Sequence, residues 1–167
     1  ELGRTYFQRG RYNDAVSVYR ATIERFPGTD WERKADEQIP PTYWRNLDYP
    51  RAIAAYETLI EKYDESEVYY SAVRDIVDIL RSMGNVEEAH RQIDQALATS
   101  PGVRDRAVMT FTKAKIHFGE GLYREALELF GQLRTMRTGR TPNGTDQTET
   151  RYFEAASLER LGRTEEA

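Results

Sequence analysis

The side chains best suited to catalysis or metal binding are few in this chain of 167 residues. It has two histidines, His90 and His117, and no cysteine. Neither histidine stands in a Ser-His-Asp arrangement or at the spacing of paired metal ligands. Without cysteine there is no thiol nucleophile and no thiolate ligand. We therefore predict no catalytic residue, no metal site and no cofactor.

Acidic residues form two groups that resemble sites but are better explained in other ways. Asp75 and Asp78 share one face of an expected helix, but Arg74 and Arg81 lie beside them. We interpret this group as a salt-bridge network. The acidic run at residues 64–67 lacks the alternating oxygen ligands and the glycine of a calcium loop.

Composition excludes some classes of partner. The net charge is −4, which argues against double-stranded nucleic acid, because phosphate binding requires a basic surface. No apolar run approaches the roughly 20 residues needed to span a bilayer. We therefore expect neither nucleic-acid binding nor membrane insertion by this segment.

A ladder of alanines repeats through the chain at intervals of 37 residues: Ala15, Ala52, Ala89 and Ala126. Four residues after each comes a large apolar side chain, in order Tyr19, Tyr56, Ile93 and Phe130. Five residues before each stands a glycine or, in the second repeat, a leucine: Gly10, Leu47, Gly84 and Gly121. A fixed period of this length indicates stacked supersecondary units.

Each repeat is predicted to hold two amphipathic helices joined at the glycine. Apolar residues around each ladder alanine follow the i, i+3, i+4, i+7 spacing of one buried helix face. The glycine permits the left-handed conformation that ends a helix. Pro40 and Pro41 fall inside the expected first helix of the second repeat, where proline removes a hydrogen bond and clashes with the preceding turn. We predict a break or kink there, with Trp44 just beyond it.

This pattern resembles the tetratricopeptide-repeat family. The first repeat matches the family pattern at Leu2, Gly3, Tyr6, Gly10, Tyr12, Ala15, Tyr19 and Pro27. The resemblance implies an all-α, right-handed superhelical solenoid of antiparallel helix-turn-helix repeats. The family period is about 34 residues. The longer period here resembles repeats of bacterial envelope proteins, namely the TolA-binding type and the lipoprotein of the outer-membrane barrel-assembly machine.

We predict one array over residues 1–167, with repeats near 1–29, 32–66, 69–103 and 106–138 and a partial fifth repeat at 148–167. The step from Ala126 to Ala167 is 41 residues. We therefore expect a mobile loop at 137–148. Because the sequence starts and stops inside repeats, we expect it to belong to a longer array.

In the tetratricopeptide-repeat family the first helix of each repeat lines a concave groove, so the resemblance assigns candidate groove residues. In chain order they are Arg4, Phe7, Gln8, Lys34, Glu37, Pro41, Trp44, Arg45, Arg74, Asp78, Arg81, Phe111, Lys115, Phe118, Tyr152 and Glu159. Phe7, Trp44, Arg81 and Phe118 form a column at 37-residue spacing. Aromatic and arginine side chains carry much of the energy of interfaces. The alternative for the aromatic members is packing against neighbouring helices.

The predicted function is that of a non-enzymatic scaffold that binds a protein or peptide carrying acidic and apolar residues. The resemblance favours the bacterial cell envelope, and a cytoplasmic location stays open. Two other functions also stay open: a self-assembling module that stacks on other copies through its ends, and a regulatory or substrate-positioning domain of a larger enzyme.

Overall fold

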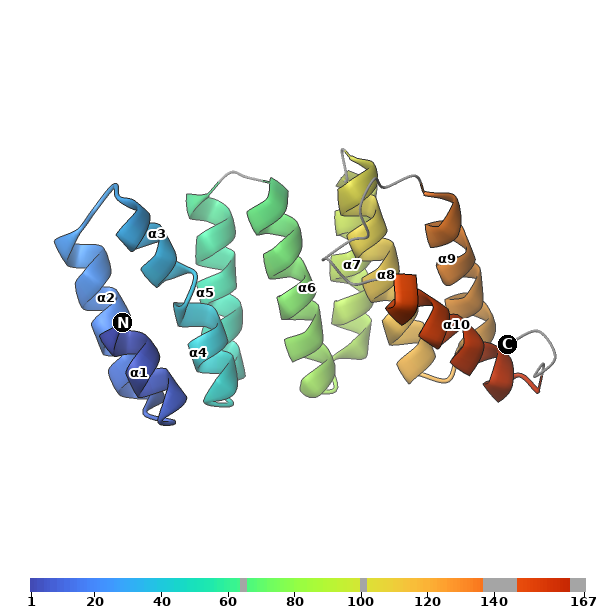
Figure 1. Ribbon diagram of the computed structural model, residues 1–167, viewed down its shortest axis with the longest axis horizontal. Coiled ribbons are helices and arrows are strands. Elements are labelled where there is room, and N and C mark those ends of the chain that lie inside the picture. The colour runs from blue at the N-terminus through green and yellow to red at the C-terminus, as the bar shows by residue number, and fades with distance from the viewer. Residues whose placement is uncertain (64–65, 100–101, 137–146, 163–167) are drawn as a thin grey trace. The chain divides into compact units, whose positions relative to one another are not determined.

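The structure is a computed structural model that describes residues 1–63, 66–99, 102–136 and 147–162. Within these residues every regular element is an α-helix (Figure 1). The chain divides into an N-terminal body, Glu1–Asn85, and a C-terminal body, Val86–Ala167. The all-α prediction is confirmed. The single array over residues 1–167 stays a prediction, and the expected loop at 137–148 lies outside the described residues except at its last two positions.

Helices of the N-terminal body pack against their neighbours in chain order, and neighbouring helices run antiparallel except the third and fourth, which run in the same direction (Figure 1). The helices are α1 (Leu2–Gln8), α2 (Tyr12–Arg25), α3 (Asp30–Asp36), α4 (Ile39–Arg45), α5 (Tyr49–Lys62) and α6 (Ser66–Ser82). One core cluster joins α1, α2 and α3, where Ala15, Tyr19 and Ala35 are buried together. The antiparallel pairing expected from the repeat pattern is therefore present.

The C-terminal body contains α7 (Val86–Thr99), α8 (Val103–Gly119), α9 (Tyr123–Thr135) and α10 (Gln147–Arg160). Its core is aromatic: Phe111 and Phe130 are buried with Ala114 and Ala126. Phe153 of α10 stacks on Phe130, with ring centroids 5.7 Å apart and an interplanar angle of 8°. This contact fastens α10 to α9.

The alanine ladder is buried in both bodies. Ala15, Ala52, Ala89 and Ala126 are each 0% exposed. A methyl side chain at these positions lets two helix backbones approach closely, and a larger side chain would cost about 1–3 kcal/mol through overpacking.

Four turns between successive helices share one backbone conformation. Gly10, Gly84 and Gly121 have φ values of 72°, 79° and 80°, and Leu47 occupies the same left-handed region at 59°. In the second repeat the amide of Asp48 then donates to the carbonyl of Tyr43 at 3.0 Å, closing the turn. Leu47 therefore adopts a conformation that side chains with a Cβ rarely take.

The first helix of the second repeat is broken, as the two prolines predict. α3 ends at Asp36, and α4 begins at Ile39. Pro40 lies in the first turn of α4, where a missing amide hydrogen costs little. The break divides one expected helix into two short ones.

Candidate binding grooves

Two grooves of the N-terminal body occupy equivalent places in successive repeats. The first, of about 660 Å³, is lined by α1, α2 and α3, and its residues include Arg4, Phe7, Gln8, Tyr19, Trp31, Lys34, Ala35 and Glu37. The second, of about 490 Å³, is lined by α3 to α6, and its residues include Arg33, Glu37, Pro41, Tyr56, Glu67, Val68, Ser71, Ala72 and Asp75. Both volumes lie in the range of about 300–1,000 Å³ that is typical of ligand sites.

The repeat period relates the two grooves residue by residue. Tyr19 and Ala35 of the first groove become Tyr56 and Ala72 of the second, and all four are buried. The floor is therefore the same in both grooves, because each floor belongs to the packed core.

The walls of the two grooves differ in chemistry. Trp31 and Lys34 of the first groove correspond to Val68 and Ser71 of the second. Trp31 is 61% exposed, and the Lys34 Nζ lies 5.2 Å from its ring centroid. An exposed tryptophan beside a cation is a side-chain pair suited to binding.

The lining of the first groove includes two cationic side chains, Arg4 and Lys34. Within the described residues, neither Arg4 nor Lys34 forms an ion pair, whereas Glu37 pairs with Arg33 at 3.0 Å. On the floor, burial raises the pKa of Tyr19, so its hydroxyl stays protonated and neutral. The groove therefore combines exposed aromatic surface with two cations that form no ion pair with a described residue, and Glu1 adds a carboxylate to its lining.

The start of α3, which carries Trp31, is held by a helix cap. The Thr29 hydroxyl donates to the Phe26 carbonyl at 2.6 Å and accepts from the Glu32 amide at 3.5 Å. The Glu32 carboxylate also accepts from the Gly28 amide. Thr29 and Glu32 thus satisfy amide groups at the beginning of the helix, as in a capping box.

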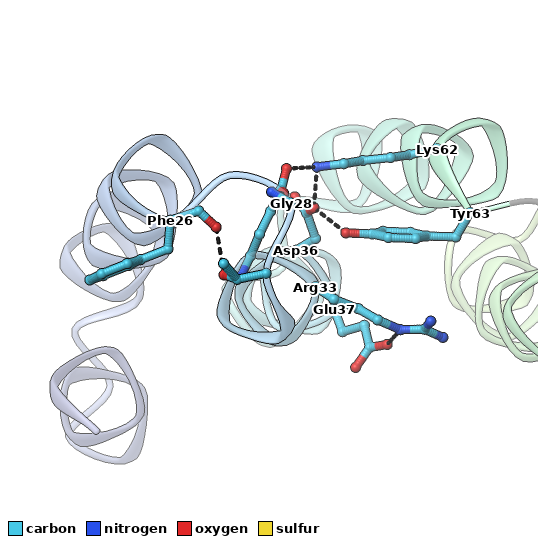
Figure 2. A network of polar contacts seen from close by, with 9 residues as sticks. Phe26, Gly28, Arg33, Asp36, Glu37, Lys62 and Tyr63 are labelled. Carbon is cyan, nitrogen blue, oxygen red and sulfur yellow. Dashed lines mark hydrogen bonds and ion pairs between the residues drawn. The ribbon is translucent and has the colours of Figure 1, made fainter.

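A polar network fastens α3 to the end of α5 (Figure 2). The Lys62 ammonium lies 2.6 Å from Glu32 and 2.5 Å from Asp36, and the Tyr63 hydroxyl donates to Asp36 at 2.7 Å. Burial and the hydrogen bond to Asp36 raise the pKa of Tyr63 to about 12. Hydrogen bonds from Lys62 and from the Gly28 amide lower the pKa of Glu32. This network sets the position of α3, and with it the wall of the first groove.

In the second groove, Asp75 is occupied by internal partners. The Tyr56 hydroxyl donates to its Oδ2 at 2.9 Å, and the Arg74 guanidinium donates to its Oδ1 at 2.8 Å. Arg81 pairs with Asp78 at 3.7 Å. The predicted salt bridges of α6 are confirmed. Because these charges are matched within the helix, Arg74, Asp78 and Arg81 offer less to a partner than their types suggested.

Four sequence-predicted groove residues of the C-terminal body gather around Phe153. Phe118 makes an edge-to-face contact with its ring at 5.2 Å, and Tyr152 does so at 5.3 Å. The Lys115 Nζ lies 5.9 Å from the ring centroid of Phe153. Phe111 is only 5% exposed and belongs to the core. Phe111 is therefore a packing residue and not a groove residue.

The predicted column of Phe7, Trp44, Arg81 and Phe118 is distributed over both bodies. Phe7 lines the first groove and packs edge-to-face on Tyr12 at 5.6 Å. Trp44 is half-buried in α4 and is not among the residues that line either groove. A continuous surface along this column stays a prediction.

Sequence reasoning missed Trp31 and Phe153. Trp31 stands 37 residues before Val68, so the two occupy the same position of the repeat. Because Val68 lines the second groove, the repeat period predicts that Trp31 lines the first. Its location on the first turn of a short helix depends on the break at Pro40, which the family pattern does not contain. Phe153 lies in the last interval of the alanine ladder, which is 41 residues long, so the 37-residue period does not align it with a residue of an earlier repeat.

Comparison with known families supports the repeat pattern. Two family models, both described as tetratricopeptide repeat, match residues 1–29 and residues 41–102. Together they cover more than half of the chain. The chain belongs to the tetratricopeptide-repeat family. As a member of a repeat family whose arrays serve as binding surfaces, this tetratricopeptide-repeat protein is expected to have protein partners.

One curated relative is the outer membrane protein assembly factor BamD of Haemophilus influenzae, which is 27% identical over 64 residues. The match covers 38% of this chain and 24% of the relative, so it spans about a quarter of that protein.

Two further observations on this tetratricopeptide-repeat protein concern membrane-spanning helices and possible metal ligands. Within the described part of the chain, none of the helices combines the length and apolar character that crossing a bilayer requires. Among the described residues, the atoms that could hold a metal ion belong to His90, His117 and Glu120 of the C-terminal body.

Proposed function

We propose that this chain is a non-enzymatic scaffold that binds an extended peptide segment of a partner protein in the first groove. The observation that carries the proposal is the exposed Trp31 beside Lys34, facing Arg4 and Phe7 across a floor that is already packed. The aromatic surface suits an apolar side chain, and the unpaired cations suit acidic ones. The expected partner segment therefore carries an aromatic or aliphatic residue flanked by aspartate or glutamate.

The proposed setting is an assembly complex of the bacterial envelope. It is supported by the similarity to a protein named as an outer membrane assembly factor and by the longer repeat period. The matched segment covers 24% of that protein. The envelope setting is therefore our proposal for this chain and is not carried over from the relative.

The test begins with peptides selected from a random dodecapeptide library on the immobilised chain. A fluorescein-labelled winner is then titrated against the wild type and two matched variants, Trp31→Ala and Trp44→Ala. These are the two tryptophans of the chain. We expect Trp31→Ala to weaken binding at least about tenfold, because truncating a central aromatic contact costs roughly 2 kcal/mol, and Trp44→Ala to change it less than about threefold.

Two controls make the result decisive. Circular dichroism checks that both variants keep the helix content of the wild type. Enrichment of acidic and apolar residues in the selected peptides supports the charge argument. Loss of binding in Trp44→Ala with full binding in Trp31→Ala would instead favour the 37-residue column and refute the first groove.

A further inference from the structure

The two histidines of this chain, far apart in sequence, lie together in the C-terminal body. His90 is near the start of α7, and His117 is in the last turn of α8. Their ring centroids are 5.1 Å apart, at an interplanar angle of 34°. Because α7 and α8 pack against each other, this meeting follows from the same helix pairing that builds the core.

Glu120, the residue that follows α8, brings a carboxylate to both rings. The His90 Nε2 lies 3.0 Å from each carboxylate oxygen. The His117 Nδ1 lies 3.6 Å from Oε2, which is too long for a hydrogen bond. The three candidate ligand atoms all lie within 4.8 Å of one another.

His117 Nδ1 is buried and lacks a hydrogen-bond partner among the described residues. A buried polar atom without a partner is costly and requires an explanation. The side chains of His90, His117 and Glu120 are nevertheless 25%, 15% and 24% exposed. The cluster is therefore partly open to solvent. The buried His117 Nδ1 carries a lone pair or an N–H that no described residue engages in a hydrogen bond.

We propose that His90, His117 and Glu120 bind a divalent transition-metal ion, with Zn²⁺ as the expected ion and water in the remaining position. Two imidazole nitrogens and one carboxylate form a ligand set that Zn²⁺ accepts readily. Bonds of about 2.1 Å in a tetrahedral arrangement place ligand atoms about 3.4 Å apart. The candidate ligand atoms lie within 4.8 Å of one another, so no observed spacing exceeds the required one by more than about 1.4 Å.

The charges around the cluster are compatible with a cation. Lys113 and Glu125 act on His117 electrostatically. The Lys113 ammonium is paired with the Asp94 carboxylate at 2.6 Å, which offsets its repulsion of a bound ion. The ion would join the beginning of α7 to the end of α8, so its binding would stabilise this helix pair.

The first experiment needs no variant. The 167-residue chain, freed of metal with EDTA and dialysed, is titrated with ZnCl₂ while the ¹⁵N resonances of the two imidazoles are followed by NMR. We expect both to shift together and saturate at one equivalent, with a dissociation constant below about 10 µM, so that 100 µM Zn²⁺ raises the melting temperature. Imidazole signals that do not move at 100 µM Zn²⁺ overturn the proposal.

The second experiment compares variants by calorimetry. His90→Ala, His117→Ala and Glu120→Gln should each weaken Zn²⁺ binding at least about tenfold, since even the loss of an outer-shell partner costs about 10–100-fold in metal affinity. Glu128→Gln removes the same charge from an exposed position of α9 and should change the affinity less than about threefold. Unchanged affinity in His117→Ala, or equal losses in Glu128→Gln and Glu120→Gln, would overturn the site.

Folding of each variant is checked in EDTA by circular dichroism, so that lost binding is not confused with lost structure. If a histidine variant unfolds, the NMR titration of the wild type still decides the question.

Discussion

The first and second grooves of the N-terminal body have the same floor and different walls. In both, a buried tyrosine and a buried alanine sit at matching positions of the repeat: Tyr19 and Ala35, then Tyr56 and Ala72. On the walls, Trp31 stands where the second groove has Val68. Packing constrains the floor, because a change there alters the fit of two helices. The wall faces solvent and is free to vary.

Charge separates the two grooves further. Asp75 of the second groove is held by Tyr56 and Arg74, whereas the Lys34 Nζ of the first lies beside the Trp31 ring and forms no ion pair with a described residue. One groove uses its polar groups to hold its own helices together, and the other leaves them available. The same scaffold thus presents one surface suited to a partner and one that mainly stabilises the fold.

If the floors are equivalent, enlarging either alanine should cost the same. Ala35→Leu and Ala72→Leu are each expected to lower the free energy of unfolding by about 1–3 kcal/mol, because both methyl groups are nearly fully buried. Urea denaturation measures the loss, with the exposed Ala21→Leu of α2 as control. A cost at one site and none at the other would show that the floors differ.

If the walls alone decide binding, they can be transplanted. Val68→Trp together with Ser71→Lys is expected to create a second site for the selected peptide, bound at least about tenfold more tightly than by the native second groove. Calorimetry should show the stoichiometry rise toward two peptides per chain. An unchanged stoichiometry in a folded variant would mean that Asp75 and Glu67, and not the missing tryptophan, prevent binding.

The polar network of Figure 2 anchors the wall of the first groove. Lys62→Met removes contacts with Glu32 and Asp36 while keeping an apolar stem of similar length. Because Lys62 is partly exposed, the expected loss of stability is below about 1 kcal/mol and shrinks in high salt. Denaturation at low and high ionic strength tests this. A loss insensitive to salt would show that packing, and not charge, anchors α3.

Acid should loosen the same anchor. The lowered pKa of Glu32 means that its ionised form stabilises the native state above the ordinary value of 4.5, and that this contribution is lost as the pH falls through the lower folded pKa. We expect Trp31 fluorescence, measured in a Trp44→Phe background, to change below pH 4.5. Glu32→Gln should abolish that step. A step that survives in this variant would assign it to another carboxylate.

Parts of this structure followed directly from local patterns. The alanine ladder predicted which positions are buried, and all four are. The glycine column predicted left-handed turns at Gly10, Gly84 and Gly121, and the structure adds a left-handed Leu47 that the sequence did not predict. Pro40 and Pro41 predicted the break between α3 and α4. These features depend on residues close in sequence and on a repeating helix pair.

The candidate sites were harder to predict, because they depend on which side chains of different helices converge. Trp31 was missed because its exposure depends on how the Thr29 cap and the Lys62 network hold α3. Phe111 was expected in a groove, but α10 supplies Phe153 to its core. The pairing of His90 with His117 was missed because 27 residues separate them, and the three-residue spacing of His117 and Glu120 does not by itself indicate a metal site.

The amino-acid sequence by itself determined that this chain is a tetratricopeptide-repeat protein with antiparallel helices, a buried alanine ladder and a proline break, since each depends on local backbone preference and a repeated apolar pattern. Only the tertiary structure decided where chemistry gathers. It placed Trp31 and Lys34 on the exposed wall of a groove and paired Asp75 with side chains of α5 and α6. It also brought two histidines that are distant in sequence close to Glu120. The physical reason is that helix packing selects these encounters, because a side chain's neighbours across a helix pair are not encoded by spacing along one helix.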